Sequence, residues 1–422
     1  MKSSAILALG SAAMATAFQQ CSGSAKNEGG NWFCGAVDHI LYSNVGHPGT
    51  YKAVSHMGSD GSCKYESKEF SGPLAPYNEE LTALFRGPMN LAQFAVYNLN
   101  GNAKRDSSAQ PSLHSRRQAH AHGHAHAHQK RGLTIFKSSK PAEAAPQIMA
   151  EVPEPEPSPE PTTTSSTSTK EPEPTLSEPS QETGGWNRIG YYNAKEGVAD
   201  GITFLGNYGG EGSGSFDNVW GNSLSYLNSK ASGGASSPQV LENVFIPSNK
   251  EFAIYSDREC KDGSCGYYRP GAVAYHGFPG DSKVFLFEFD MPLDGNTGFN
   301  GDMPAVWTLN AKIPRTQQYG DCSCWQSDCG EFDIYEVLAP GDTKCKSTFH
   351  TNVDGGSSDY FKRPVNGLIK VATVFDAASG AVSVKELPSD VKFSAKLAEE
   401  LVQSWIDTEK DTGAFSLFSL AN

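Results

Sequence analysis

The chain has 422 residues, with 34 basic and 47 acidic side chains and a formal net charge of −13 at pH 7. This length allows more than one domain. A net negative charge argues against a nucleic-acid-binding protein, because phosphate binding needs basic surfaces. The first 17 residues combine a basic start at Lys2 with an apolar run from Ile6 and the small-residue ending Ala15-Thr16-Ala17. This pattern is typical of a signal peptide, so we expect residues 1–17 to be removed on export.

No other apolar stretch approaches the ~20 residues that a membrane crossing needs. We therefore expect a secreted, extracellular or cell-wall protein with no membrane anchor. In an oxidising compartment cysteines are read as disulfides rather than as metal ligands. We expect the late cysteines to form three disulfides with one another: Cys260, Cys265, Cys322, Cys324, Cys329 and Cys345. One of the three early cysteines would then be left over, either free or joined to another chain.

Residues 18–100 are Gly-rich and aromatic and contain Cys21, Cys34 and Cys63. Short strands are expected at Trp32-Phe33-Cys34 and over residues 36–42, separated by turns. We therefore expect a small, disulfide-pinned, β-rich N-terminal module.

Residues 101–185 are predicted to be a disordered linker. A His-rich, basic tract with three dibasic pairs comes first, and it suits either processing proteases or weak metal binding. A Pro/Glu/Ser/Thr tract follows, with nine acids and one lysine between residues 141 and 185, a net of −8. Its hydroxyl density suggests an O-glycosylated stalk. Because the excess acid sits here, the folded parts are near neutral, which suits a neutral polysaccharide better than a polyanion.

Residues 186–422 show many short runs of alternating apolar and polar residues. Strands are expected over residues 284–290, 305–309, 331–337, 347–350 and 368–375, with one helix from about Ser394 to Ile406. This spacing predicts an all-β domain, a β-sandwich jelly roll.

Three carboxylates occur within six residues of one expected strand, at Glu331, Asp333 and Glu336. On a regular strand Glu331 and Asp333 share a face and Glu336 does not. A single β-bulge near Ile334-Tyr335 would return Glu336 to that face. Solvated acids on an exposed strand are the alternative, but the intervening apolar residues favour a central strand. A retaining glycosidase needs two such carboxyl groups, about 5–5.5 Å apart.

The motif Glu331-x-Asp333-x-x-Glu336 resembles the bulged signature of glycoside hydrolase family 16. The run from Gly301 to Leu309 resembles that family's G-x-W-P-A-x-W strand, with Met303 in place of the first Trp, and Ser347 to His350 resembles its groove strand. The overall layout is similar to fungal cell-wall proteins of the TOS1 type. The resemblance implies an endo-β-1,3-glucanase that acts on cell-wall β-glucan. We expect no cofactor, no metal and a monomer.

Carried over residue by residue, the resemblance makes Glu331 the nucleophile, Asp333 its assistant and Glu336 the acid/base. Trp307 and Trp325 would be sugar-stacking platforms and His350 a hydrogen-bond donor to substrate. Core packing is the alternative for Trp307 and for His350. The same carboxylates would also serve a glucan transglycosylase, and a non-catalytic β-glucan-binding wall protein is a third hypothesis.

Overall fold

The structure is a computed structural model that describes residues 24–99 and 185–422, apart from residues 262, 410, 412, 421 and 422. The expected signal peptide, the His-rich tract, the Pro/Glu/Ser/Thr tract and Cys21 lie outside these residues. The described residues on both sides of the long gap belong to one compact unit. Among them no helix is long and apolar enough to cross a membrane.

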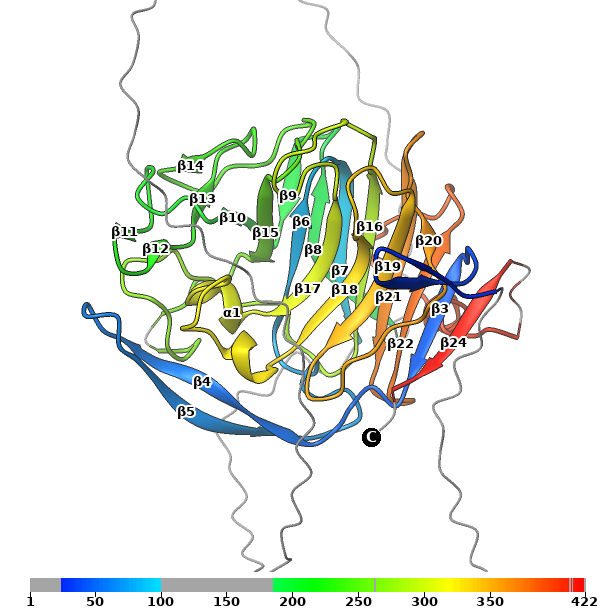
Figure 1. Ribbon diagram of the computed structural model, residues 1–422, viewed down its shortest axis with the longest axis horizontal. Helices are drawn as coiled ribbons and strands as arrows, with labels where there is room; N and C mark the ends of the chain where they lie inside the picture. The colour runs from blue at the N-terminus through cyan, green and yellow to red at the C-terminus, as the bar shows by residue number, and fades with distance from the viewer. Residues whose placement is uncertain (1–23, 100–184, 262, 410, 412, 421–422) are drawn as a thin grey trace, which may run out of the picture. The chain divides into compact units, whose positions relative to one another are not determined.

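Two nine-stranded sheets pack face to face, which confirms the all-β sandwich (Figure 1). The strands of the first sheet are, in spatial order, β14 (Gly234–Ala235), β13 (Ser225–Leu227), β10 (Ile202–Gly206), β15 (Glu251–Ser256), β6 (Leu81–Arg86), β17 (Ala305–Asn310), β18 (Glu331–Val337), β19 (Lys344–His350) and β20 (Phe361–Lys362). The second sheet runs β23 (Lys396–Leu397), β8 (Trp186–Asn193), β7 (Asn90–Leu99), β16 (Lys283–Asp290), β21 (Ile369–Asp376), β22 (Ala381–Leu387), β3 (His39–Ser43) and β24 (Phe415–Ser419), and β9 (Val198–Asp200) pairs with β8.

Aromatic side chains from both sheets form the interior. Phe85 of β6 contacts Phe94 of β7 and Phe287 of β16, each at 6.1 Å between ring centres. These rings are fully buried, and each buried aromatic side chain stabilises the fold by about 2 kcal/mol or more. The strands predicted over residues 284–290, 305–309, 331–337, 347–350 and 368–375 are all present, as β16, β17, β18, β19 and β21.

The N-terminal segment contributes strands to both sheets. β6 lies between β15 and β17, and β7 lies between β8 and β16. The physical reason is visible in β6, where Leu81 to Phe85 are all buried. One face of β6 packs between the sheets and Leu84 on the other face packs in an outer cluster, while β15 and β17 satisfy the backbone hydrogen bonds of both edges. The described residues before and after the long gap therefore meet in one sandwich.

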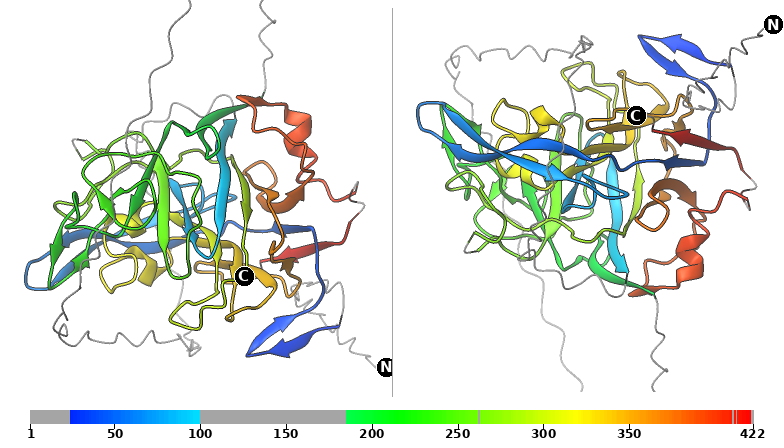
Figure 2. Two further views of the ribbon diagram at one scale, coloured as in Figure 1. Left: turned by 90° about the horizontal axis from the view of Figure 1, so that it is seen from above. Right: turned by 90° about the horizontal axis from the view of Figure 1, so that it is seen from below.

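Three two-stranded hairpins lie outside the sandwich: β1 (Lys26–Glu28) with β2 (Asn31–Phe33), β4 (Gly49–Met57) with β5 (Cys63–Phe70), and β11 (Phe216–Asp217) with β12 (Gly221–Asn222). The views from above and below show the long β4–β5 hairpin running along one side of the first sheet (Figure 2). The short helices are α1 (Lys312–Arg315), η1 (Cys324–Ser327) and α2 (Glu399–Gln403). The helix expected from Ser394 to Ile406 is thus cut to five residues, because its first part pairs with β8 as β23.

The disulfide prediction is wrong in part. Cys260–Cys265 and Cys324–Cys329 pair among the late cysteines, but Cys322 bonds Cys63 of the β4–β5 hairpin. Cys345 is left as a buried free thiol in β19. Cys34 is disulfide-bonded. The hairpin packs beside the loop before η1, so Cys63 reaches Cys322, whereas Cys345 points into the interior between the sheets.

Candidate active site

A bulge in β18 brings the three carboxylates to one face of the first sheet. Opposite β17, Asp333 pairs with Trp307 and Tyr335 pairs with Val306, so Ile334 has no partner. The same irregularity appears opposite β19. Both Ile334 and Tyr335 lie in the interior between the sheets, with Phe332 and Val337. Glu331, Asp333 and Glu336 therefore all project from the outer face.

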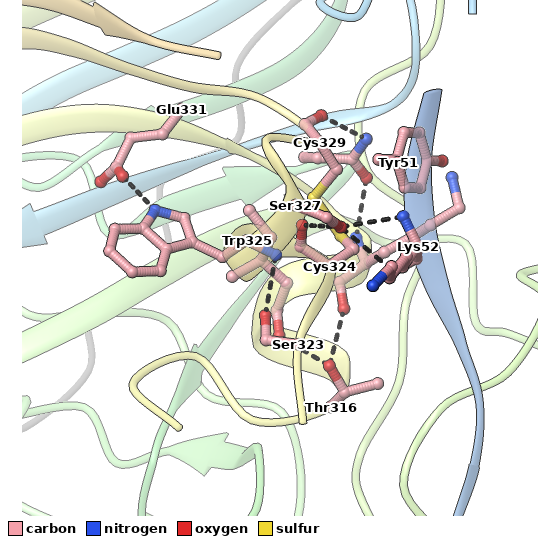
Figure 3. Close-up of a disulfide and its surroundings, with 12 residues drawn as sticks. Tyr51, Lys52, Thr316, Ser323, Cys324, Trp325, Ser327, Cys329 and Glu331 are labelled. Carbon is pink, nitrogen blue, oxygen red and sulfur yellow. Dashed lines mark hydrogen bonds between the residues drawn. A yellow bond between two sulfur atoms is a disulfide. The ribbon is translucent and has the colours of Figure 1, made fainter. Parts of the chain in front are cut away.

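Each carboxylate of this trio has a partner from another element. The indole Nε1–H of Trp325, in η1, donates to Oε2 of Glu331 (Figure 3). Nε2 of His350, in β19, lies 3.0 Å from Oδ2 of Asp333. Nη2 of Arg86, in β6, lies 3.5 Å from Oε1 of Glu336. The trio is thus surrounded by one neutral donor and two basic groups.

The surroundings raise the pKa of both glutamates above the ordinary value. Burial is the main cause for each, and the charge of Asp333 adds to it. The pKa of Glu331 rises to about 7, with His350, Trp325 and Arg86 opposing the rise. The pKa of Glu336 rises to about 8, against the opposing charge of Arg86. Both carboxyl groups therefore hold a proton to higher pH than an ordinary glutamate does.

The two carboxylates near His350 favour its protonated form. Burial lowers its pKa, but the hydrogen bond to Asp333 and the charges of Asp333 and Glu331 outweigh burial and raise the pKa to about 10. Its side chain remains 44% exposed. It can therefore contact both Asp333 and a bound molecule, and the core alternative does not describe it.

The two tryptophans differ in exposure. Trp325 is 43% exposed and its ring lies beside Glu331 (Figure 3). Trp307 is only 4% exposed, and the guanidinium of Arg86 lies 5.8 Å from its ring centre. It belongs to a buried cluster on the outer face of the first sheet, together with Leu84 and Leu309. Core packing thus accounts for most of its surface.

Sequence reasoning missed a second row of polar groups beside Glu336. Arg86 also approaches Oε1 of Glu251, on β15, at 3.6 Å. The hydroxyl of Tyr319 donates to Oε2 of Glu251 at 2.5 Å. Burial raises the pKa of Glu251, although Arg86 and Tyr319 act to lower it. Nothing near these residues resembles a motif, and an Arg at the end of the apolar run Leu81 to Phe85 was the one available signal.

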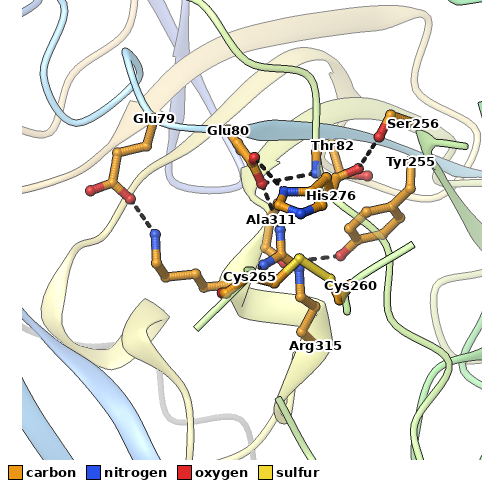
Figure 4. Close-up of polar contacts among 12 residues, drawn as sticks. Glu79, Glu80, Thr82, Tyr255, Ser256, Cys260, Cys265, His276, Ala311 and Arg315 are labelled. Carbon is orange, nitrogen blue, oxygen red and sulfur yellow. Dashed lines mark hydrogen bonds and ion pairs between the residues drawn. A yellow bond between two sulfur atoms is a disulfide. The ribbon is translucent and has the colours of Figure 1, made fainter. Parts of the chain in front are cut away.

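Partly buried ion pairs hold α1 against the start of β6 (Figure 4). Glu80 accepts from Arg315 at 3.0 Å and lies 2.7 Å from His276. Glu79 pairs with Lys312 at 2.6 Å. Burial tends to raise the pKa of Glu79, but Lys312 and Lys68 outweigh it and lower the pKa to about 2. These contacts fix the end of β6 that is opposite to Arg86.

One group in the described residues has metal-ligand spacing. The sulfur atoms of Cys260 and Cys265 and a ring nitrogen of His276 lie within 4.8 Å of one another. Both sulfurs are used in a disulfide, however, so they are not available as thiolate ligands.

Comparisons with known proteins agree over most of the chain. Residues 184–405 match the family described as "Cell wall protein YJL171C/Tos1, C-terminal", and residues 38–99 match the corresponding N-terminal family. The chain belongs to this family of cell-wall proteins. The resemblance to fungal TOS1-type proteins is thereby confirmed, whereas the resemblance to glycoside hydrolase family 16 stays a prediction.

Three relatives are each 40% identical to this chain. Proteins of Candida albicans and Saccharomyces cerevisiae, both named "Probable circularly permuted 1,3-beta-glucanase TOS1", align with 90% and 92% of this chain and with 92% and 93% of their own lengths. A "Probable circularly permuted 1,3-beta-glucanase" of Arthroderma benhamiae aligns with 93% of this chain and 94% of its own length. No solved structure matches.

Both family segments contribute to the carboxylate site. The N-terminal match contains Arg86, and the C-terminal match contains Glu251 and the three carboxylates of β18. The site is therefore complete only when the two segments share the first sheet.

Proposed function

We propose that this protein is a secreted endo-β-1,3-glucanase of the fungal cell wall that acts by a retaining double displacement. The observation that carries the proposal is the β-bulge that places Glu331, Asp333 and Glu336 on one face of β18. The family and the names of the 40%-identical relatives support the substrate class. The disulfides support export, since such bonds persist in oxidising compartments.

In this proposal Glu331 is the nucleophile. Its carboxylate attacks the anomeric carbon and forms a glycosyl ester while the bond to the leaving sugar oxygen breaks. Glu336 gives its proton to that oxygen, which fits the raised pKa of this carboxyl. Asp333 lies between them along β18 and, with its hydrogen-bonded partner His350, is assigned the assisting role.

The second step reverses the role of Glu336. Once Glu331 is esterified it carries no charge, so one source of the raised pKa of Glu336 is removed. Glu336 then takes a proton from a water molecule, whose oxygen attacks the anomeric carbon and releases Glu331. Two inversions at that carbon give overall retention.

Substrate contacts are proposed for the exposed ring of Trp325 and for the imidazole of His350, which can donate to sugar hydroxyls. Trp307 pairs with Asp333 across the strands, and its buried ring would support that side of the site. Stacking on a sugar would use the small part of the ring that remains exposed. We further propose that the protein acts as a monomer without nucleic-acid partners.

The relatives' names suggest that this chain is circularly permuted too. The central place of β6 and β7, between strands that all come after residue 185, supports that order. A permuted chain would bring early and late segments into adjacent strands, as in the parallel pair of β3 and β24.

Laminarin, a soluble β-1,3-glucan, tests the proposal. Wild-type protein is expected to release reducing ends, and Glu331→Gln to release at least a hundredfold fewer, because the attacking oxygen anion is lost. Products longer than the substrate would identify a transglycosylase with the same residues. Binding without any product from wild-type protein would identify a non-catalytic glucan-binding protein and contradict the proposal.

A further inference from the structure

Trp325 makes a contact that sugar stacking does not require. Its indole Nε1–H donates to Oε2 of Glu331, while much of the ring stays exposed. An indole N–H donates only and cannot give up its proton at ordinary pH. It can therefore stabilise the ionised carboxylate and fix one oxygen, leaving the other oxygen of Glu331 to react.

The turn that carries Trp325 is held locally at both ends. The backbone N–H of Trp325 donates to Oγ of Ser323 at 3.2 Å. Ser327 donates to the carbonyl of Cys324 at 3.0 Å, and the Cys324–Cys329 disulfide closes the turn onto the start of β18 (Figure 3).

The β4–β5 hairpin holds the same turn from outside. The backbone N–H of Lys52 donates to Oγ of Ser327 at 2.8 Å. The hydroxyl of Tyr65 donates to the carbonyl of Asp321 at 2.6 Å. The Cys63–Cys322 disulfide adds a covalent tether across 259 positions of sequence. Three contacts thus converge on residues 321–327.

The hairpin is itself anchored by four buried side chains, those of Tyr51, Val54, Met57 and Phe70. Tyr51 is 1% exposed and donates to Glu79, at 3.0 and 2.9 Å to the two carboxylate oxygens. By contrast, most of β5 is exposed, from Lys64 to Glu69. None of the four belongs to the interior cluster between the sheets: Tyr51 and Phe70 pack in the outer cluster with Trp307, and Val54 and Met57 pack with Cys322. The hairpin is therefore packed against the outer face of the first sheet and the loop before η1.

From these contacts we propose that Trp325 is a positioning residue for Glu331, and that the N-terminal β4–β5 hairpin holds Trp325 in place. This inference rests on the proposed function, in which Glu331 is the nucleophile. The N-terminal family segment then serves catalysis in two ways: it supplies Arg86 and it orders the turn beside the nucleophile.

Several groups besides Trp325 affect the pKa of Glu331. Asp333 raises the pKa of Glu331, whereas His350, Trp325 and Arg86 lower it. The remaining titratable groups that interact with it are Glu336, Tyr77 and Tyr319. Losing the indole N–H removes one group that favours the carboxylate, so the pKa of Glu331 is expected to rise.

An NMR experiment tests the contact without any activity measurement. The chain has six tryptophans, so ¹⁵N-Trp labelling gives a small set of indole resonances, and the one missing in Trp325→Phe is that of Trp325. This resonance is expected to shift with pH as Glu331 ionises, and to lose most of that shift in Glu331→Gln. An identical titration in both proteins would overturn the inference even if the enzyme hydrolyses glucan.

Kinetics separate positioning from stacking. Trp325→Phe keeps a ring but no N–H, so kcat is expected to fall about tenfold with KM nearly unchanged, and the acidic limb of the kcat/KM profile to move to higher pH. Trp325→Ala is expected to raise KM as well. A Trp325→Phe enzyme with wild-type kcat and pH profile would contradict positioning.

The hairpin's part is tested with Ser327→Ala and with the double variant Cys63→Ser/Cys322→Ser. For each, we expect part of the loss in kcat and part of the shift of the acidic limb that are expected for Trp325→Phe. Cys260→Ser/Cys265→Ser, which removes a disulfide elsewhere, is the matched control and is expected to keep the wild-type profile. If Ser327→Ala also keeps that profile, the hairpin does not position Trp325. A wild-type enzyme that is inactive on every glucan would instead refute the proposed function, and the NMR result would still stand.

Discussion

The guanidinium of Arg86 lies 3.5 Å from the carboxylate of Glu336, although the two residues are 250 positions apart in sequence. Arg86 is at the end of β6, and Glu336 lies two strands away on β18, with β17 between them. The proposed acid/base therefore depends on a strand from the N-terminal segment.

Replacement of Arg86 should change the pH dependence of hydrolysis in a defined direction. Arg86 lowers the pKa of Glu336, so Arg86→Met is expected to raise that pKa and to move the basic limb of the kcat/KM profile to higher pH. We also expect kcat to fall at least tenfold, because Glu251 loses its ion pair and the site becomes more negative. Arg188→Met, on β8 of the second sheet, is the control. An unchanged basic limb in Arg86→Met would show that Arg86 does not act on the acid/base.

Peptide mapping should find a Cys63–Cys322 crosslink between the early and the late part of the chain. Alkylation without denaturant is expected to leave Cys345 unlabelled, because the thiol is buried and burial raises its pKa far above the usual range. Alkylation in denaturant without reductant should label it. Labelling of Cys345 in the native protein, or a Cys322–Cys345 bond, would contradict the structure.

Much of the sandwich could be predicted, because the strands of residues 284–375 alternate clearly or run apolar between turns. The bulge at Ile334-Tyr335 could be predicted as well. The three carboxylates reach one face only if β18 has one extra residue between Asp333 and Glu336. The placement of β6 and β7 could not, because an apolar run such as Leu81 to Phe85 indicates a buried strand without indicating its neighbours.

Contacts between residues that are far apart in the sequence could not be predicted either. No local pattern links Cys63 to Cys322 or Arg86 to Glu336, since each pair is joined by tertiary packing alone. The prediction of three disulfides among the late cysteines was wrong for this reason. It assumed a separate C-terminal domain, whereas the β4–β5 hairpin packs on the loop before η1.

Removing the proposed nucleophile should stabilise the protein at neutral pH. The pKa of Glu331 rises from 4.5 to about 7 on folding. Between these values the folded state binds more protons than the unfolded state, so this group's contribution to stability falls as pH rises. Glu331→Gln is expected to gain about 1 kcal/mol, or about 2 °C in Tm, at pH 7.5 and much less at pH 4. The control is Glu399→Gln, an exposed residue of α2. An equal change in Tm of Glu331→Gln at both pH values would argue against a raised pKa.

The roles of the two glutamates can be separated by the stereochemistry of azide products. In Glu336→Gln the nucleophile remains, so an activated aryl β-glycoside still forms the ester, whereas natural glucan, which needs a proton on its leaving oxygen, is slowed far more. Azide then attacks the ester without general-base help and is expected to give a β-glycosyl azide. In Glu331→Ala the nucleophile is missing, so azide displaces the aryl group directly and is expected to give the α-glycosyl azide. Product NMR distinguishes the two anomers.

The assignment fails if the anomers are exchanged between the two variants. It fails equally if wild-type enzyme first releases the inverted sugar, because a double displacement requires retention even when both glutamates are essential.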